Sequence, residues 1–151
     1  MLAKTHVAFG ILAGLVTLKY TTVSNELLFI ALVILGVFLP DIDHPESKVN
    51  NSLKVTKVIP LFFGHRGFFH SIFAVILVFA GLWYWQGFIY GFGVSIGYLS
   101  HLISDALTVS GVGFLNPVAH YKVRGVVQTG TVMETLVFFA VIAVDAWLLV
   151  H

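Results

Sequence analysis

Long runs of apolar residues, separated by short polar stretches, dominate the chain. Five such runs lie at positions 7–18, 27–39, 68–85, 88–107 and 132–150. An α-helix that crosses a bilayer needs about 17 to 25 mostly apolar residues. The last three runs reach that length, and the first two reach it only if His6, Lys19 and Glu26 lie among the lipid headgroups. The pattern predicts an all-α integral membrane protein, a compact bundle of about five transmembrane helices forming a single domain over residues 1–151.

The composition supports a membrane protein. Hydrophobic residues make up 58% of the chain, charged residues make up 10%, and the mean hydropathy is +0.97. Soluble domains carry about 25% charged residues, so a water-soluble core fits this chain poorly. The net charge of +1 argues against a nucleic-acid partner. Because the chain has no cysteine, disulfides and thiolate metal sites are excluded, and any metal must be held by nitrogen and oxygen ligands.

Lysine and arginine positions predict the orientation. If the segments that connect the helices alternate between the two sides of the membrane, all but one of the lysines and arginines fall on one side, and only Lys19 falls on the other. The residues on the first side are Lys4, Lys48, Lys54, Lys57, Arg66, Lys122 and Arg124. Positively charged residues are retained in the cytoplasm, so we expect a multi-pass inner-membrane protein with its N-terminus inside. Lys4 precedes the first run as in a signal peptide, but no small-residue cleavage site follows in LKYTTVSNE, and we expect this run to be retained.

The ionisable residues gather at one predicted membrane depth. On this topology the cytoplasmic helix ends carry His6, Asp41, Asp43, His44, His65, His70, His101, Asp105 and Glu134. The topology rests on lysine and arginine alone, so this agreement is independent of it. Charged groups inside membrane helices are unfavourable by about 2.5 to 3.5 kcal/mol at the bilayer centre. We therefore expect His101 and Asp105, in the fourth run, to have partners.

The spacing of these residues points to a metal site. His101 and Asp105 are four residues apart, so on a helix they project from the same face. Imidazole together with carboxylate suits Zn, Mn or Fe in the divalent state. The candidate metal ligands are His6, Asp41, His65, His70, His101 and Asp105.

Simpler interpretations compete for single residues. His44 is typical of an interfacial anchor, Arg66 of a positive-inside anchor, and Asp43 of a solvated acid after a helix. His120 and His151 lie outside the cluster and are expected at the surface, and Asp145 has no assigned role. Six coincidental anchors explain the candidate ligands less well than one shared metal site.

Three ordered stretches carry a family resemblance. LPDIDHP, GHRGFFHS and GYLSHLISDALTVSGVGFLNP follow an N-terminal THVAFG, and together they resemble the membrane-bound metal-dependent hydrolases of the YdjM type. That family is also described as LexA-binding, inner-membrane-associated hydrolases. The matching positions are His6, Asp41, Asp43, His44, His65, Arg66, His70, Ser71, His101, Asp105 and Thr108, with Glu134 as the acid that opens the final helix. Phe69 and Asn116 depart from relatives, which often carry threonine and tryptophan there, and this bears on substrate preference.

The resemblance implies a metal-dependent hydrolase of the cytoplasmic membrane, with a LexA-type protein as a partner. Six ligands are more than one tetrahedral catalytic ion needs, so we expect one or two ions, zinc first and Mn or Fe as alternatives. In a pair of ions, Asp41 or Asp105 would bridge. Asp43 or Glu134 would act as general base or orienting group, and Arg66 would clamp an anionic group such as a phosphate.

The depth of the cluster predicts an amphipathic substrate in the lipid bilayer, such as a phosphoester or ester of a lipid, with a soluble phosphoester as the alternative. The glycine-rich loop after Thr108 is either a lid or a plain connection. Two rival functions remain. An oxidative di-iron enzyme would carry repeated histidine boxes, which are missing here. A non-enzymatic metal-binding or LexA-interacting protein would close its site against substrate.

Overall fold

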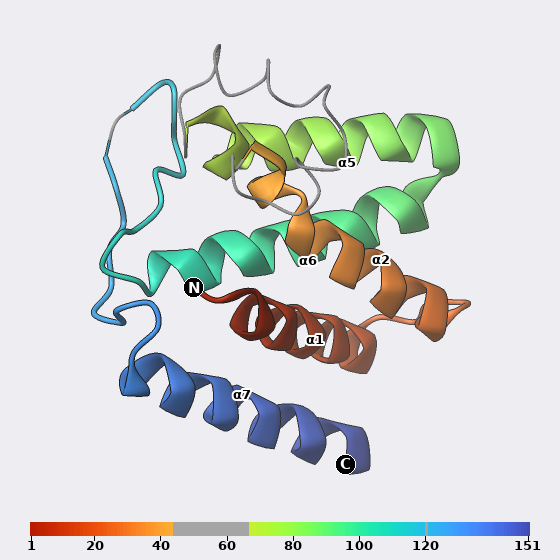
Figure 1. Cartoon of the computed structure of the whole chain (residues 1–151). Coiled ribbons are helices and arrows are strands. Elements are labelled where there is room, and N and C mark those ends of the chain that lie inside the picture. Colours follow the sequence, from red (N-terminus) through yellow and green to blue (C-terminus); the bar gives the residue numbers. More distant parts are fainter. Residues whose placement is uncertain (44–66, 120) are drawn as a thin grey trace.

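The computed structural model describes residues 1–43, 67–119 and 121–151 (Figure 1). Its described regular structure is helical apart from two isolated β-bridges. The elements are α1 (Ala3–Tyr20), α2 (Glu26–Phe38), the 3-10 turns η1 (Pro40–Asp43) and η3 (Phe68–His70), α5 (Ile72–Gln86), α6 (Phe88–Ala106) and α7 (Val132–Val150). The predicted all-α fold with five long helices is confirmed.

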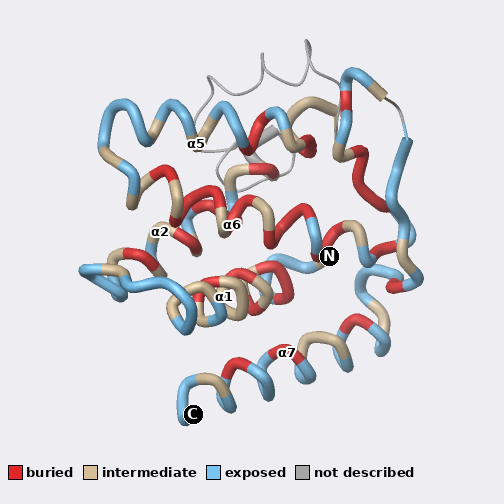
Figure 2. Tube along the Cα trace, turned by 180° about the vertical axis from the view of Figure 1, so that it is seen from behind, coloured by how far each residue is buried: buried red, intermediate tan, exposed pale blue. Residues whose placement is uncertain are grey.

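Helix α6 is the centre of the bundle. It packs against α1, α2 and α5, while α7 packs against α1. Buried positions therefore follow α6 along most of its length, and α7 is largely exposed (Figure 2). The starts of α1, α5 and α7 lie at the same end of the molecule as the ends of α2 and α6 (Figure 1). This alternation brings the polar helix ends together.

Short-range signals explain several helix boundaries. The Asn25 side chain accepts a hydrogen bond from Leu28 N at the start of α2, and Ser71 Oγ does the same for Ala74 N at the start of α5. Helix α2 ends just before Pro40, whose ring cannot continue a helix interior. Gly87, with φ of 104°, permits the sharp turn between α5 and α6.

Glycines bring α2 and α6 into backbone contact. A Cβ added at Gly97 of α6 would collide with the carbonyl oxygen of Val33, and one at Gly36 of α2 would collide with that of Val94. Gly93, Gly97, His101 and Asp105 follow each other at four-residue spacing, so they form one row on α6. The close contact therefore holds the end of α2 against the histidine and aspartate that continue the row.

The described helices differ in whether their length and composition suit a membrane-spanning segment. Among the described helices, Val132–Val150 alone is long and apolar enough to cross a bilayer by itself. Helices α2 and α5 are apolar but have 13 and 15 residues. Five transmembrane helices therefore stay a prediction.

The connection between α6 and α7 packs onto the bundle at several points. Val112 lies in a buried cluster with Ala74, Val75, Tyr98 and Leu102. Val112 and Val123 exchange backbone hydrogen bonds, and Phe114 O accepts from Ile72 N at the start of α5. These contacts favour a fixed connection over a lid for the part of the loop around Val112.

We predict that Gly97→Ala destabilises the protein by about 1 to 3 kcal/mol, because the new methyl group forces α2 and α6 apart. Gly81→Ala is the matched control, since its Cβ would meet nothing within 4 Å. That change is expected to be neutral or to stabilise α5 by up to about 1 kcal/mol. Thermal unfolding in detergent measures both. Equal stability of the two variants would contradict the close contact.

Candidate metal centre

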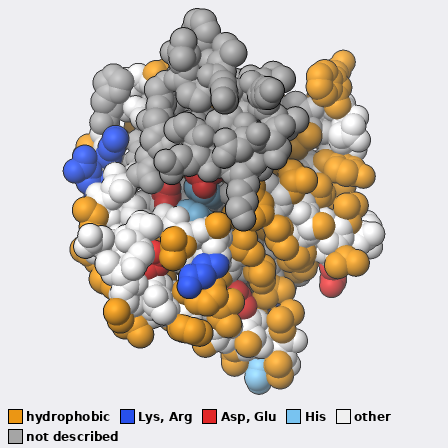
Figure 3. Space-filling model, in the orientation of Figure 1, with side chains coloured by type: hydrophobic (Ala, Val, Ile, Leu, Met, Phe, Trp, Pro, Cys, Tyr) orange, Lys and Arg blue, Asp and Glu red, His pale blue; other side chains and the backbone are white. Residues whose placement is uncertain are grey.

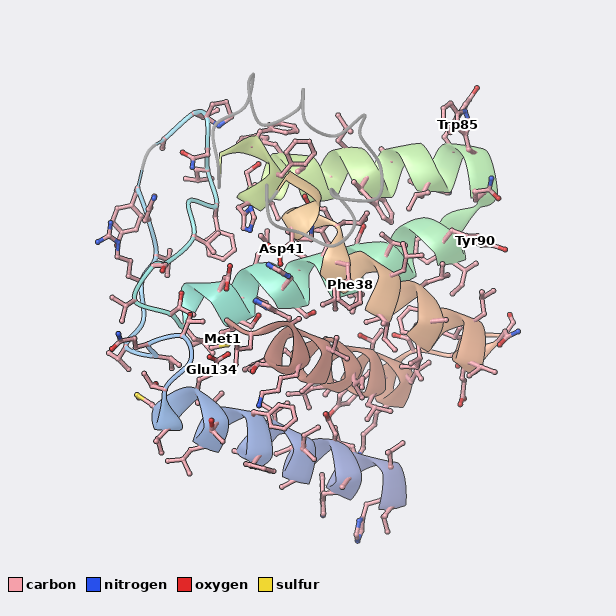
Figure 4. All side chains as sticks on the ribbon, viewed as in Figure 1. Met1, Phe38, Asp41, Trp85, Tyr90 and Glu134 are labelled. Carbon is pink, nitrogen blue, oxygen red and sulfur yellow. The ribbon has the colours of Figure 1, made fainter. Side chains whose placement is uncertain are left out.

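Five of the six predicted ligands lie together in the structure. These ligands are His6 of α1, Asp41 of η1, His70 of η3, and His101 and Asp105 of α6. Two overlapping triads, His6–His101–Asp105 and Asp41–His70–His101, each have ligand atoms within 4.8 Å of one another. Figure 4 shows Asp41 lying over the middle of the bundle, and Figure 3 shows acidic and histidine side chains at the edge of the undescribed region. This buried group could hold a metal ion.

His70 and His101 each lie close to one oxygen of Asp41 and one oxygen of Asp105. His70 Nε2 lies 3.8 Å from Asp41 Oδ1 and 4.0 Å from Asp105 Oδ2, and His101 Nε2 lies 3.7 Å from each of the same oxygens. Direct hydrogen bonds between nitrogen and oxygen are about 2.7 to 3.2 Å long. Two ligands of a tetrahedral zinc ion lie roughly 3.3 Å apart, from bonds of about 2.0 Å. A small inward movement would therefore suffice for an ion at the centre.

The backbone fixes the tautomer of His101. Its Nδ1 lies 2.8 Å from the carbonyl oxygen of Val37, which can only accept a hydrogen bond. Nδ1 must therefore carry the proton. The lone pair of the neutral ring is left on Nε2, which is buried and has no hydrogen-bond partner among the described residues. A buried acceptor without a donor is unfavourable, and a metal ion would satisfy it.

A serine positions the ring of His6. Ser104 Oγ lies 2.7 Å from His6 Nδ1 and donates to the carbonyl oxygen of His101 at 2.8 Å. The other ring nitrogen, Nε2, faces Asp105. Metal binding requires the neutral imidazole. The His6 ring stacks on His101 at 3.8 Å.

Asp105 lies between the two triads. Its Oδ1 is 3.3 Å from His6 Nε2, and its Oδ2 faces His70 and His101. The Met1 ammonium also lies close, 2.7 Å from Oδ1 in this structure. The carboxylate therefore presents one oxygen to each side, as a bridging ligand does.

The described donors differ in exposure. His6, His70, His101 and Asp105 are each at most 3% exposed. The Asp41 side chain is 45% exposed. Asp41 is therefore the described donor with the most access to solvent.

Glu134 supports the centre from below. Its Oε1 accepts hydrogen bonds from Leu2 N and Thr5 Oγ1, and its Oε2 accepts from Gly130 N. These contacts fasten the start of α1 to the start of α7 and hold Met1 near Asp105 (Figure 4). The geometry gives Glu134 an orienting role, and its role as general base stays a prediction.

Other predicted residues fall into two groups. His44, His65 and Arg66 lie outside the described residues, and of Asp43 only the backbone, at the end of η1, is described. Thr108 and Ser71 have structural roles: Thr108 Oγ1 donates to Asp105 O, and Ser71 caps α5. Sequence reasoning missed Ser104, whose one signal is its place between His101 and Asp105.

Comparison with known proteins identifies the family. The model of the family described as YdjM inner membrane protein matches residues 1–150. The chain belongs to the YdjM family. The protein named "Uncharacterized protein YvsG" of Bacillus subtilis is 35% identical over 140 residues, covering 91% of this chain and 87% of that protein. "Inner membrane protein YdjM" of Escherichia coli is 37% identical over 126 residues, covering 76% of this chain and 63% of that protein.

The protein from Shigella flexneri with the same name matches to the same extent. The chain thus spans less than two thirds of the two proteins named YdjM. No solved structure matches it. Membership in the YdjM family supports a membrane location, as the composition predicts.

We predict that Ser104→Ala weakens zinc binding about 10- to 100-fold, because His6 loses the partner that orients its ring. Ser95→Ala is the matched control. Ser95 is a buried serine on the same helix whose hydroxyl has no hydrogen-bond partner among the described residues. Competition against a chelator of known affinity measures both variants. Equal weakening by the two changes would contradict the positioning role of Ser104.

Proposed function

We propose that this member of the YdjM family is a metal-dependent hydrolase that cleaves a phosphoester or ester of an amphipathic lipid. One observation carries the proposal. The buried cluster directs Nε2 of His6 and of His101 toward Asp105, with both rings held by hydrogen bonds at Nδ1. Imidazole and carboxylate donors suit zinc, with manganese and iron as alternatives.

A two-ion centre uses the donors most fully. The one lone pair of His101 Nε2 can serve one ion, which Asp41, His70 and Asp105 Oδ2 would complete. His6 Nε2 and Asp105 Oδ1 would then hold a second ion. That ion needs further ligands, and His65, outside the described residues, is our candidate. Asp105 would be the bridging aspartate.

The exposure of Asp41 supports catalysis over a closed binding site. A structural zinc site is closed by four protein ligands, and a catalytic site keeps one position open. The half-exposed Asp41 marks where water and substrate would enter. A divalent ion held here would supply Lewis acidity and lower the pKa of a water molecule. A non-enzymatic metal-binding or LexA-interacting protein is the alternative, favoured only by the burial of the other donors.

The protein residues would position the reaction. Asp41 would orient the water, since its carboxylate is the exposed member of the cluster. Glu134 would keep the start of α1, and with it His6, against α6. Asp43 as general base and Arg66 as the clamp for an anionic group remain proposals from the sequence.

Charge placement supports a cytoplasmic site. Lys4, Lys122 and Arg124 belong to the segments at the donor end, while Lys19 lies at the other end of α1, over the Trp147 ring. Since positive charge is retained in the cytoplasm, the donor end would face the cytoplasm. With α7 spanning the bilayer, the centre would lie near the headgroups of the inner leaflet, where an amphipathic substrate presents its polar bond.

We predict that the purified, zinc-loaded protein hydrolyses at least one lipid among a phosphomonoester, a phosphodiester and a carboxylic ester presented in mixed micelles. Chelation abolishes the activity, and added zinc restores it. Asp41→Asn lowers kcat at least about 100-fold, the scale of a lost catalytic contact. Glu26→Gln, at the exposed start of α2, leaves it unchanged. Released phosphate and fatty acid are measured. Failure of the fully loaded protein on all three lipids would contradict the proposal and favour the binding role.

A further inference from the structure

An apolar groove runs along the outer face of α5. Its volume is about 860 Å³, and its described lining consists of seven α5 residues and Phe68 of η3. The lining extends from Phe73 near the start of α5 to Trp85 near its end. Small side chains at Ala80 and Gly81 deepen the middle of the groove.

The groove adjoins the elements that carry two of the donors. A smaller cavity of about 90 Å³ shares Phe68 and Leu77 with it and is also lined by Leu39 and Tyr98. Leu39 lies two residues before Asp41, and Phe68 lies two residues before His70. The smaller cavity is therefore lined by residues within two positions of two candidate metal ligands.

The length and chemistry of the groove fit one hydrocarbon chain. Twelve helical positions separate Phe73 from Trp85, a length of about 18 Å at 1.5 Å per residue. One leaflet of a bilayer has a hydrocarbon thickness of about 15 Å. A bound peptide would need partners for its backbone polar groups. Among the described lining residues, only the side chains of Tyr84 and Trp85 carry polar atoms.

We propose that the α5 groove binds one acyl or prenyl chain of the lipid whose polar bond is presented to the donor cluster. The inference rests on the proposed function and adds how the substrate is held. The chain would lie along α5 with its headgroup end at Phe68, beside His70 and Asp41. Binding would then select lipids by the length of one chain as well as by the headgroup.

Gly81 offers a direct way to block the groove. A Cβ at this position meets nothing within 4 Å, and Gly81 belongs to the groove lining, so a side chain placed here starts in open space beside the groove. Gly81→Phe would obstruct the groove at its middle and leave room only for a short chain. Val144→Phe is the matched control, because Val144 is exposed on α7, far from the groove lining.

The test uses the full chain in phosphatidylcholine vesicles that contain a small fraction of phosphatidic acid with a photoreactive diazirine at the end of one acyl chain. After irradiation, mass spectrometry of peptides locates the adducts. We expect adducts concentrated on α5 groove residues such as Leu77 and Trp85 over the exposed face of α7. Gly81→Phe should reduce groove labelling about tenfold, equivalent to about 1.4 kcal/mol, and Val144→Phe should not. Unchanged zinc content in both variants confirms folding.

Uniform labelling of all lipid-facing helices, or equal groove labelling in Gly81→Phe and the parent protein, would overturn the inference. Labelling does not require turnover, so the two proposals fail separately. Groove labelling without hydrolysis would support the chain-binding site and contradict the hydrolase function. Hydrolysis with uniform labelling would support the hydrolase function and contradict the chain-binding site.

Discussion

The backbones of α2 and α6 touch where Gly36 and Gly97 leave no side chain between them, and the geometry of the donor cluster depends on this contact. It places Val37 O within 2.8 Å of His101 Nδ1. That hydrogen bond fixes the tautomer of His101 and the direction of its Nε2. The same contact holds the end of α2, and with it η1 and Asp41, over α6. A wider spacing between α2 and α6 would separate the two triads of the donor cluster, His6–His101–Asp105 and Asp41–His70–His101.

Burial of the donor cluster makes its negative charge unfavourable unless a cation binds. Three imidazoles and the Asp105 carboxylate lie almost completely out of solvent. Nε2 of His6 and Nε2 of His101 face the Asp105 carboxylate, and a buried carboxylate is unfavourable in a low-dielectric interior without a compensating cation. In this structure the Met1 ammonium lies against Asp105. A divalent ion would neutralise the carboxylates and satisfy the imidazole nitrogens together, which ties binding of the ion to stability of the fold.

The sequence predicts the helices and part of the site for clear physical reasons. Apolar runs locate the helices, and four-residue spacing places His101 and Asp105 on one face. Alternating topology brings His6, Asp41 and His70 to the same end, as the structure confirms. Ser104 was missed because one hydroxyl in an apolar helix has no distinctive pattern, and its role depends on the approach of α1. The hydrogen bonds that Glu134 accepts from Leu2 N and Thr5 Oγ1 are equally invisible, because they join residues more than a hundred positions apart.

Metal content shows directly whether the buried cluster binds a divalent metal ion. The protein is purified in detergent, and bound metal per chain is measured by inductively coupled plasma mass spectrometry beside Asp105→Asn and Asp145→Asn. Asp145 is the control because it is a buried aspartate on α7, outside the cluster. We expect between about one and two ions of Zn, Mn or Fe per chain, lost in Asp105→Asn and kept in Asp145→Asn. A protein that holds no metal, even after metal is added, would contradict this expectation.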